Sequence, residues 1–269
     1  KKKMYLKELG YAFILMIGSM TYGVVSVYTS PTGLAIRTLH NISDTSVEWT
    51  LYCSIPFLFG IVGSYITKVI LSLFKGKRKP SVFTIDCIGT AAWLLNCLTK
   101  INIIAGIISR ALCGVAFGAY MTIIPMYLVE IAPPGNSGIF GAMNQFGVCI
   151  GNILFSILGP YLDYMEFNYL GAAICLLQGF LIWLVPESPE ADKGEIKEAS
   201  LLSVFKKKYA KGLFIGITTM FMVQFSGING ILANLNTIMT EGGLNMDPNF
   251  QSTIAVASQF IAIIVEFVT

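Results

Sequence analysis

The fold is decided by Arg110–Gln145, which reads RALCGVAFGAYMTIIPMYLVEIAPPGNSGIFGAMNQ. An almost uncharged apolar segment begins at Arg110 and ends on Glu130, and a Gly/Pro turn leads into a second apolar segment. Gly114 and Gly118 stand four residues apart, a spacing that lets two membrane helices approach closely. Charges in or beside a membrane span are costly unless they are paired, so Arg110 and Glu130 are candidates for a functional site.

The composition indicates an integral membrane protein. The 269 residues are 55% hydrophobic and only 12% charged, whereas a soluble domain carries about 25% charged residues. A helix needs about 20 apolar residues to cross a bilayer. Such segments are Gly10–Thr29, Trp49–Phe74, Ser81–Thr99, Ile101–Tyr127, Ile139–Tyr161, Tyr169–Val185 and Gly212–Met239. An eighth, Ser252–Thr269, is still apolar at its last residue, so we expect a longer protein. These segments predict an all-α, polytopic bundle of transmembrane helices.

Basic residues predict the orientation. With the N-terminus inside, 14 of the 18 lysines and arginines lie in cytoplasmic segments, two (Arg37 and Lys100) lie in external loops, and Lys68 and Arg110 lie in or at spans. This bias favours a cytoplasmic N-terminus, and we expect a multi-pass protein of the plasma membrane. Asn41 then lies outside in the glycosylation sequon Asn41-Ile42-Ser43.

The longest polar stretch suggests the domain organisation. We expect residues 1–186 to form a six-helix bundle, residues 187–211 a cytoplasmic linker, and residues 212–269 the start of a second bundle. The six cysteines show no metal-ligand spacing, and no Ser/His/Asp or Cys/His constellation appears. We therefore expect no metal, no cofactor and no enzymatic activity, and no nucleic acid as a partner.

The motifs resemble those of the sugar porter family of the major facilitator superfamily. A fourth helix rich in small residues is followed by Tyr-x-x-Glu, and Pro186-Glu187-Ser188-Pro189 follows the sixth span. The matching positions are Leu112, Gly114, Gly118, Tyr127 and Glu130. Ser137 and Glu190 depart from the family, which has basic residues there. The resemblance implies a six-plus-six helix fold and alternating-access transport of a small neutral sugar, glucose or another hexose.

Amide side chains in the spans are the candidate sugar ligands, because a neutral sugar both donates and accepts hydrogen bonds. The resemblance implies sugar contacts for Gln145, Gln224, Asn229 and Gln259. Gln224 and Asn229 would lie about 140° apart on a regular helix. A local unwinding at Ser226-Gly227 is needed to turn both inward. Interhelical hydrogen bonding is the alternative role for each amide taken alone.

The resemblance also implies two gates. Arg110, Glu130 and Glu187 are expected to form a cytoplasmic latch between the bundles, weakened by the departures at 137 and 190 or rebuilt with Lys206–Lys208. Ala233 and Asn234 take the place of the family's tyrosines at the external gate. A smaller and more polar gate would suit different substrates or close less tightly.

The first span argues for facilitated diffusion. It contains no Asp, Glu or His, and Val25 stands near the position where proton-coupled relatives carry an aspartate. Asp86 is expected to be structural. Glu266, in the eighth apolar segment, could carry a proton, so a proton-coupled symporter is an alternative. A non-transporting sugar sensor is the other main alternative, and a membrane enzyme or channel the remaining one. The oligomeric state is taken as monomeric.

Overall fold

The computed structural model describes residues 2–191, 208–243, 250–251, 253–255 and 257–260. All regular secondary structure in these residues is helical. The helices are α1 (Lys2–Val27), α2 (Thr29–His40), α3 (Val47–Leu73), α4 (Arg78–Asn96), η1 (Cys97–Lys100), α5 (Ile103–Ile131), α6 (Ser137–Leu158), α7 (Tyr164–Leu181), η2 (Ile182–Leu184), α8 (Ala210–Phe225), α9 (Ile228–Ala233) and α10 (Leu235–Glu241). Within the described residues, seven helical stretches are long and apolar enough to cross a membrane, which confirms the predicted polytopic helical fold.

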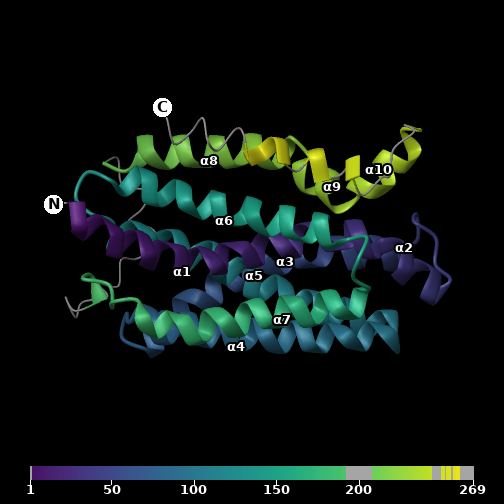
Figure 1. Cartoon of the computed structure of the whole chain (residues 1–269), viewed down its shortest axis with the longest axis horizontal. Coiled ribbons are helices and arrows are strands. Elements are labelled where there is room, and N and C mark those ends of the chain that lie inside the picture. The colour runs from purple at the N-terminus through teal and green to yellow at the C-terminus, as the bar shows by residue number, and fades with distance from the viewer. Residues whose placement is uncertain (1, 192–207, 244–249, 252, 256, 261–269) are drawn as a thin grey trace.

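The long helices lie roughly side by side along the long axis of the molecule (Figure 1). α4 and α7 form one side, α6 and α8 the other, and α1 and α5 lie between them (Figure 1). We call α1–α7, with the two short 3₁₀ helices η1 and η2, the first bundle. The largest side chains buried in its core are Trp93, Arg110, Tyr28, Tyr52, Tyr120, Tyr127, Phe155 and Phe167.

Polar residues in the turns set where several helices begin. The Ser46 hydroxyl accepts a hydrogen bond from the Trp49 amide (3.2 Å), and α3 starts between them. Asp163 and Glu166 form a reciprocal capping box at the start of α7. Each cap satisfies amide groups that have no partner within the helix.

Glycines bring the backbones of α3 and α5 into direct contact. A Cβ atom added at Gly114 would overlap the Pro56 carbonyl oxygen, and one added at Gly118 would overlap the Gly60 carbonyl oxygen. Gly63 is equally close to the Val115 carbonyl oxygen. The close helix approach predicted from the spacing of Gly114 and Gly118 is therefore confirmed.

The seventh span is broken, as its sequence suggested. Gly212–Met239 was expected as one span, but α8 ends at Phe225 and Gly227 adopts a left-handed backbone conformation (φ +74°) before α9 begins. A second break at Asn234 separates α9 from α10. The eighth predicted span lies largely outside the described residues, as does most of the predicted linker.

Candidate functional site

One face of α6 carries a row of polar side chains. Gln145, Cys149 and Asn152 are spaced four and three residues apart, which places them on successive turns of the same face. Gln259 Oε1 accepts a hydrogen bond from Asn152 Nδ2 (3.4 Å) and contacts Cys149 Sγ (3.6 Å). Gln145 is exposed one turn before Cys149. Two of the predicted amides, Gln145 and Gln259, thus lie on one polar face.

Asn152 extends this row to α1. The Ser26 hydroxyl donates to Asn152 Oδ1 (3.0 Å) and also to the Gly23 carbonyl oxygen (2.8 Å). Asn152 is almost fully buried (1% exposed). Its amide therefore joins α1, α6 and the segment that carries Gln259. The sequence prediction missed Asn152 and Ser26, although Asn152 follows Gln145 at two helical turns.

Gln224 and Asn229 meet across the break in the seventh span. Asn229 Nδ2 donates to Gln224 Oε1 (2.9 Å), so the unwound Ser226-Gly227 step turns two side chains toward each other that a regular helix would separate. Gln224 is exposed. Within the part of the chain described, no hydrogen bond joins this pair to Gln145, so the structure keeps the four predicted amides as two pairs.

The predicted external gate lies against the start of α2. The Ala233 carbonyl oxygen accepts a hydrogen bond from the Thr29 hydroxyl (3.0 Å), and the Asn236 amide donates to the Ser30 hydroxyl (3.1 Å). Ala233 is buried, and Asn234 turns back to donate to the Gly230 carbonyl oxygen (3.1 Å). Thr29 and Ser30 were not predicted as contact residues. Each bonds to a backbone group of the C-terminal segment, and every residue carries such a group, so no residue type in that segment marks the contact.

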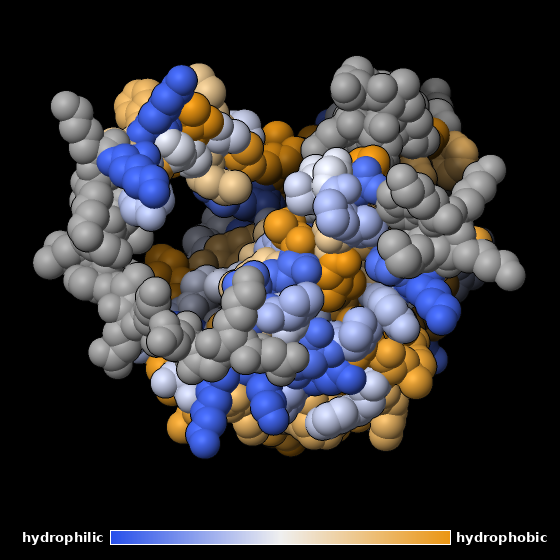
Figure 2. Space-filling model, turned by 90° about the vertical axis from the view of Figure 1, so that its left-hand side faces the viewer, coloured by the Kyte–Doolittle hydropathy of each residue, from blue (hydrophilic) through white to orange (hydrophobic). Residues whose placement is uncertain are grey.

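These contacts hold α9 and α10 to the first bundle at the α2 end, and Gln259 contacts α6 nearer its middle. Val27 packs with Leu232 and Leu235 in a small buried cluster, whereas α8 has no buried residue. Figure 2 looks at the opposite end, which carries the N-terminus, and shows the surface hollowed below the upper left lobe. The described part of the molecule is thus closed at the α2–α9 end and open at the other.

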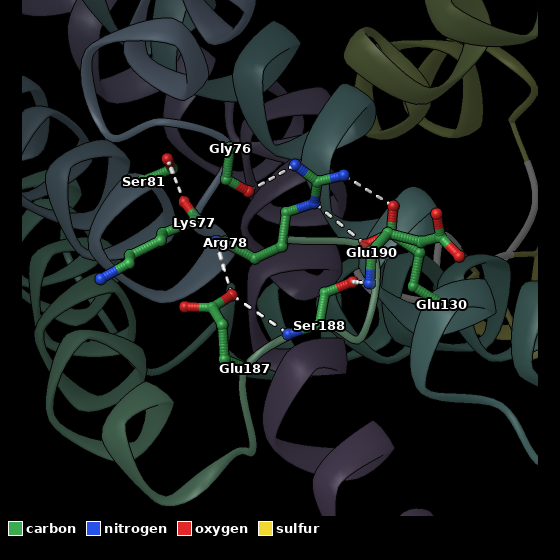
Figure 3. A network of polar contacts seen from close by, with 8 residues as sticks. All are labelled: Gly76, Lys77, Arg78, Ser81, Glu130, Glu187, Ser188 and Glu190. Atoms are coloured by element: carbon green, nitrogen blue, oxygen red, sulfur yellow. Dashed lines mark hydrogen bonds and ion pairs between the residues drawn. The ribbon is translucent and has the colours of Figure 1, made fainter. Parts of the chain in front are cut away.

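A charged cluster lies around the start of α4 (Figure 3), at the end of the molecule that carries the N-terminus (Figure 1). Arg78 forms a two-pronged ion pair with Glu130, through Nε to Oε2 (2.9 Å) and Nη2 to Oε1 (2.7 Å). Its third nitrogen, Nη1, donates to the Gly76 carbonyl oxygen (2.7 Å). Both paired side chains are only 13% exposed, so this pair is shielded from most of the solvent.

Glu187 stabilises the start of α4 in the same cluster. Its carboxylate accepts from the Arg78 amide (2.6 Å) and the Ser188 amide (3.1 Å), while Lys77, the residue at the helix boundary, supplies no side-chain cap. A carboxylate at a helix N-terminus is favoured by the helix dipole and by the free amides there. The Tyr127 hydroxyl donates to the Pro186 carbonyl oxygen (2.7 Å), which fixes the segment that presents Glu187.

Arg110 does not belong to this cluster, so the prediction of a latch containing it was wrong. Arg110 and Glu130 are 20 residues apart on α5, about 30 Å along the helix, and lie near opposite ends of one span. Glu130 pairs instead with Arg78. These two residues and Glu187 lie together at the end of the first bundle that carries the N-terminus. Of the lysines suggested as replacements, Lys206 and Lys207 lie outside the described residues, and Lys208 lies over the Tyr209 ring.

Asn41 ends α2 in a left-handed conformation (φ +50°) and is exposed. It lies at the opposite end of the molecule from Arg78, and its side chain is accessible. The sequon remains a prediction.

Comparison with known proteins places the chain in a family. Residues 11–200, well over half of the chain, match the family described as "Sugar (and other) transporter". The facilitated trehalose transporter Tret1 of Culex quinquefasciatus is 27% identical over 93% of this chain, and the sugar transporter ERD6-like 7 of Arabidopsis thaliana is 24% identical over 86%. The chain spans 56% and 57% of the lengths of these two relatives.

Solved structures share the fold. A D-xylose-proton symporter has a TM-score of 0.72 at 19% identity, with 91% of this chain and 65% of that chain covered. The inward open xylose transporter XylE of E. coli has a TM-score of 0.69 at 19% identity, with 96% and 68% covered. The helical arrangement, the motifs and the family match together show that the chain belongs to the sugar transporter family of the major facilitator superfamily.

Proposed function

We propose that the full-length protein moves a neutral sugar across a membrane by alternating access. The observation that carries the proposal is the amide-lined face of α6, where Gln145 is exposed beside Asn152 and its partner Gln259. Amides match sugar hydroxyls without placing a charge in the membrane. The face lies where the first bundle meets the C-terminal segment, and substrate sites of such transporters lie between their two halves.

The proposed substrate is glucose or another hexose, with trehalose as the second candidate. The names of the insect relatives favour trehalose. The external contact at Ala233 uses a backbone carbonyl group and a small side chain, which leaves more room than a bulky aromatic gate and would suit a disaccharide.

Facilitated diffusion is the proposed mode of transport. From Gly10 to Val27, α1 carries no Asp, Glu or His, so the first helix offers no group that could carry a proton beside the site. Coupling through Glu266, which lies outside the described residues, is the alternative for a symporter. A non-transporting sensor would bind the sugar at the same face without moving it.

The contacts suggest which side of the membrane is closed. We propose a cytoplasmic N-terminus, so that the α2–α9 contacts of Thr29 and Ser30 are external and the open end near α8 faces the cytoplasm. The described conformation is then inward-facing. Residues 187–211 would link the two bundles in the cytoplasm of a monomer in the plasma membrane, and Asn41 would be glycosylated outside.

Uptake by the full-length parent in cells lacking their own sugar carriers tests this proposal. Labelled D-glucose and labelled trehalose are supplied separately, with and without a protonophore, and surface protein is quantified in parallel. We expect saturable uptake of one sugar that the protonophore leaves unchanged. Uptake abolished by the protonophore would assign a symporter instead, and sugar binding without any uptake would assign a sensor.

Asp86→Asn is expected to leave uptake within about twofold of the wild type. Asp86 is buried (2% exposed), and its Oδ1 accepts from the Tyr120 hydroxyl (2.6 Å), while its Oδ2 has no hydrogen-bond partner. An asparagine oxygen accepts the same bond without a buried charge, which favours the folded state. Thermal denaturation should show an unchanged or raised midpoint, and a strong loss of uptake by well-folded Asp86→Asn would show that this carboxyl takes part in transport.

A further inference from the structure

An apolar groove runs along α5 between α3 and α4. These two helices each pack on α5 and touch each other little. Ile55 and Phe59 of α3 line one side of the groove, Leu95 of α4 and Leu98 of η1 line the other, and α5 contributes the residues between them. The groove holds about 600 Å³, which lies within the range of about 300–1,000 Å³ typical of small-molecule sites.

The groove offers water almost nothing to bind. Among the described residues that line it, Ser109 is the polar one. Its hydroxyl is already engaged with Asn96 Oδ1 (2.9 Å) and the Gly106 carbonyl oxygen (2.8 Å), whereas a buried water needs two to four polar partners. An unfilled groove would also cost its walls their dispersion contacts. Hydrocarbon is therefore the favoured filling.

The groove has the length of one leaflet of a bilayer. Its lining residues on α5 run from Ala105 to Val115, about 15 Å along the helix axis, which is half of the hydrocarbon thickness of about 30 Å. Leu98 and Ile108 line the groove and are 41% and 67% exposed, so it is open at the surface. α4 lies on the side of the molecule opposite α6 and α8 (Figure 1), so this opening faces the bilayer rather than the start of the second bundle.

Lys100 places a positive charge near the end of the groove. It stands two residues after Leu98 in η1, is exposed, and forms no ion pair within the part of the chain that the structure describes. A lysine at the edge of a span lays its apolar stem along the protein and holds its ammonium group at the level of the lipid headgroups. A phosphate group there would complement this charge.

We propose that one acyl chain of a membrane phospholipid fills this groove and that Lys100 binds its phosphate group. The leaflet length of the groove suits an extended chain, and the position of Lys100 suits the headgroup that the chain carries. A sterol would bring a neutral hydroxyl group to the same place and leave the charge unmatched. The site lies on α3–α5, away from the polar face of α6, and the inference does not rest on the proposed function.

Native mass spectrometry of the purified full-length protein in detergent tests the site. The probes are a phosphatidylglycerol, a diacylglycerol with the same chains but no phosphate, and cholesterol, each titrated separately. We expect one saturable phosphatidylglycerol adduct and weaker binding of the diacylglycerol. The absence of a saturable phosphatidylglycerol adduct would overturn the inference, and tighter binding of cholesterol would overturn the choice of a phospholipid.

Three variants locate the lipid. Ala111→Phe fills the groove from α5, so it should weaken the phosphatidylglycerol adduct at least tenfold. Ala173→Phe, at an exposed position on α7, is the matched control and should bind as the wild type does. Lys100→Gln should weaken phosphatidylglycerol about fivefold and leave the diacylglycerol unchanged.

The variants also decide against the proposal if it is wrong. Equal phosphatidylglycerol affinity in Ala111→Phe and the wild type would contradict a lipid in the groove. If Ala111→Phe does not fold, Ala105→Phe, nearer the end of the groove, takes its place with the same expected loss. An unchanged affinity in Lys100→Gln would contradict the phosphate contact.

Discussion

Gly118→Val is expected to abolish the folded protein. A Cβ atom at this position would overlap the Gly60 carbonyl oxygen and crowd the Gly60 Cα. The clash is between two helix backbones, so no side-chain rotation can relieve it, and α3 must move away from α5. Separation would undo the neighbouring contacts of Gly114 and Gly63 at the same time, because all three belong to one close-packed seam.

Fluorescence-detected size-exclusion chromatography of the tagged full-length protein measures the effect. Gly118→Val should show aggregate and little monodisperse peak, with almost no protein at the cell surface. Gly138→Val at the start of α6 is the matched control within the first bundle, since a Cβ there meets nothing within 4 Å, and it should run as the wild type does. A monodisperse Gly118→Val protein at wild-type level would contradict the α3–α5 packing.

Arg78→Ala is expected to lower the free energy of unfolding by about 2–3 kcal/mol, between the small value of exposed ion pairs and the 3–5 kcal/mol of fully buried ones. The change removes a two-pronged pair and leaves Glu130, 13% exposed, without its cation. The side-chain bond that holds Gly76 is lost as well. Uptake by the full-length protein should fall at least several-fold, because α4 and α5 lose the side-chain contact that joins them here, although the backbone amide of residue 78 still donates to Glu187.

A double-mutant cycle separates the ion pair from other effects of Arg78. Arg78→Ala, Glu130→Gln and the double variant are compared by thermal unfolding, and the double variant should cost less than the sum of the single changes. Lys77→Ala, at an exposed neighbour, should be near neutral. Additive losses in the cycle would show that the pair contributes nothing measurable.

The sequence predicted the helices well because their signal is local. The length of each apolar segment fixes a span, and the Gly114 and Gly118 spacing requires close packing whatever the partner helix is. The break at Ser226-Gly227 was also predictable, since two amides five residues apart face each other only if the helix unwinds between them. Each of these features depends on a few consecutive residues.

The pairing within the charged cluster could not be predicted from local sequence in the same way. Which arginine meets Glu130 depends on how the start of α4 packs against the end of α5, and the altered spacing around Arg78 hid its role. Arg110 was misplaced although a simple check was available, since 20 helical residues separate it from Glu130 across one span.

The candidate site was predicted in part for a related reason. Gln145 and Gln259 could be chosen by residue type, because an amide in a membrane span needs a polar partner. Asn152 repeats the position of Gln145 two turns later and could have been found from that spacing. The hydrogen bonds of Thr29 and Ser30 to the backbone of α9–α10 have no such signal.

The most direct test of the account is sugar uptake by Gln145→Ala in the full-length protein, normalised to surface protein. Gln145 is exposed on α6, so its loss should not disturb folding, and we predict that uptake falls at least tenfold. Ile139→Ala, a partly exposed apolar position on the same helix, should keep wild-type uptake. Wild-type uptake by Gln145→Ala at equal surface density would contradict a sugar site on the polar face of α6.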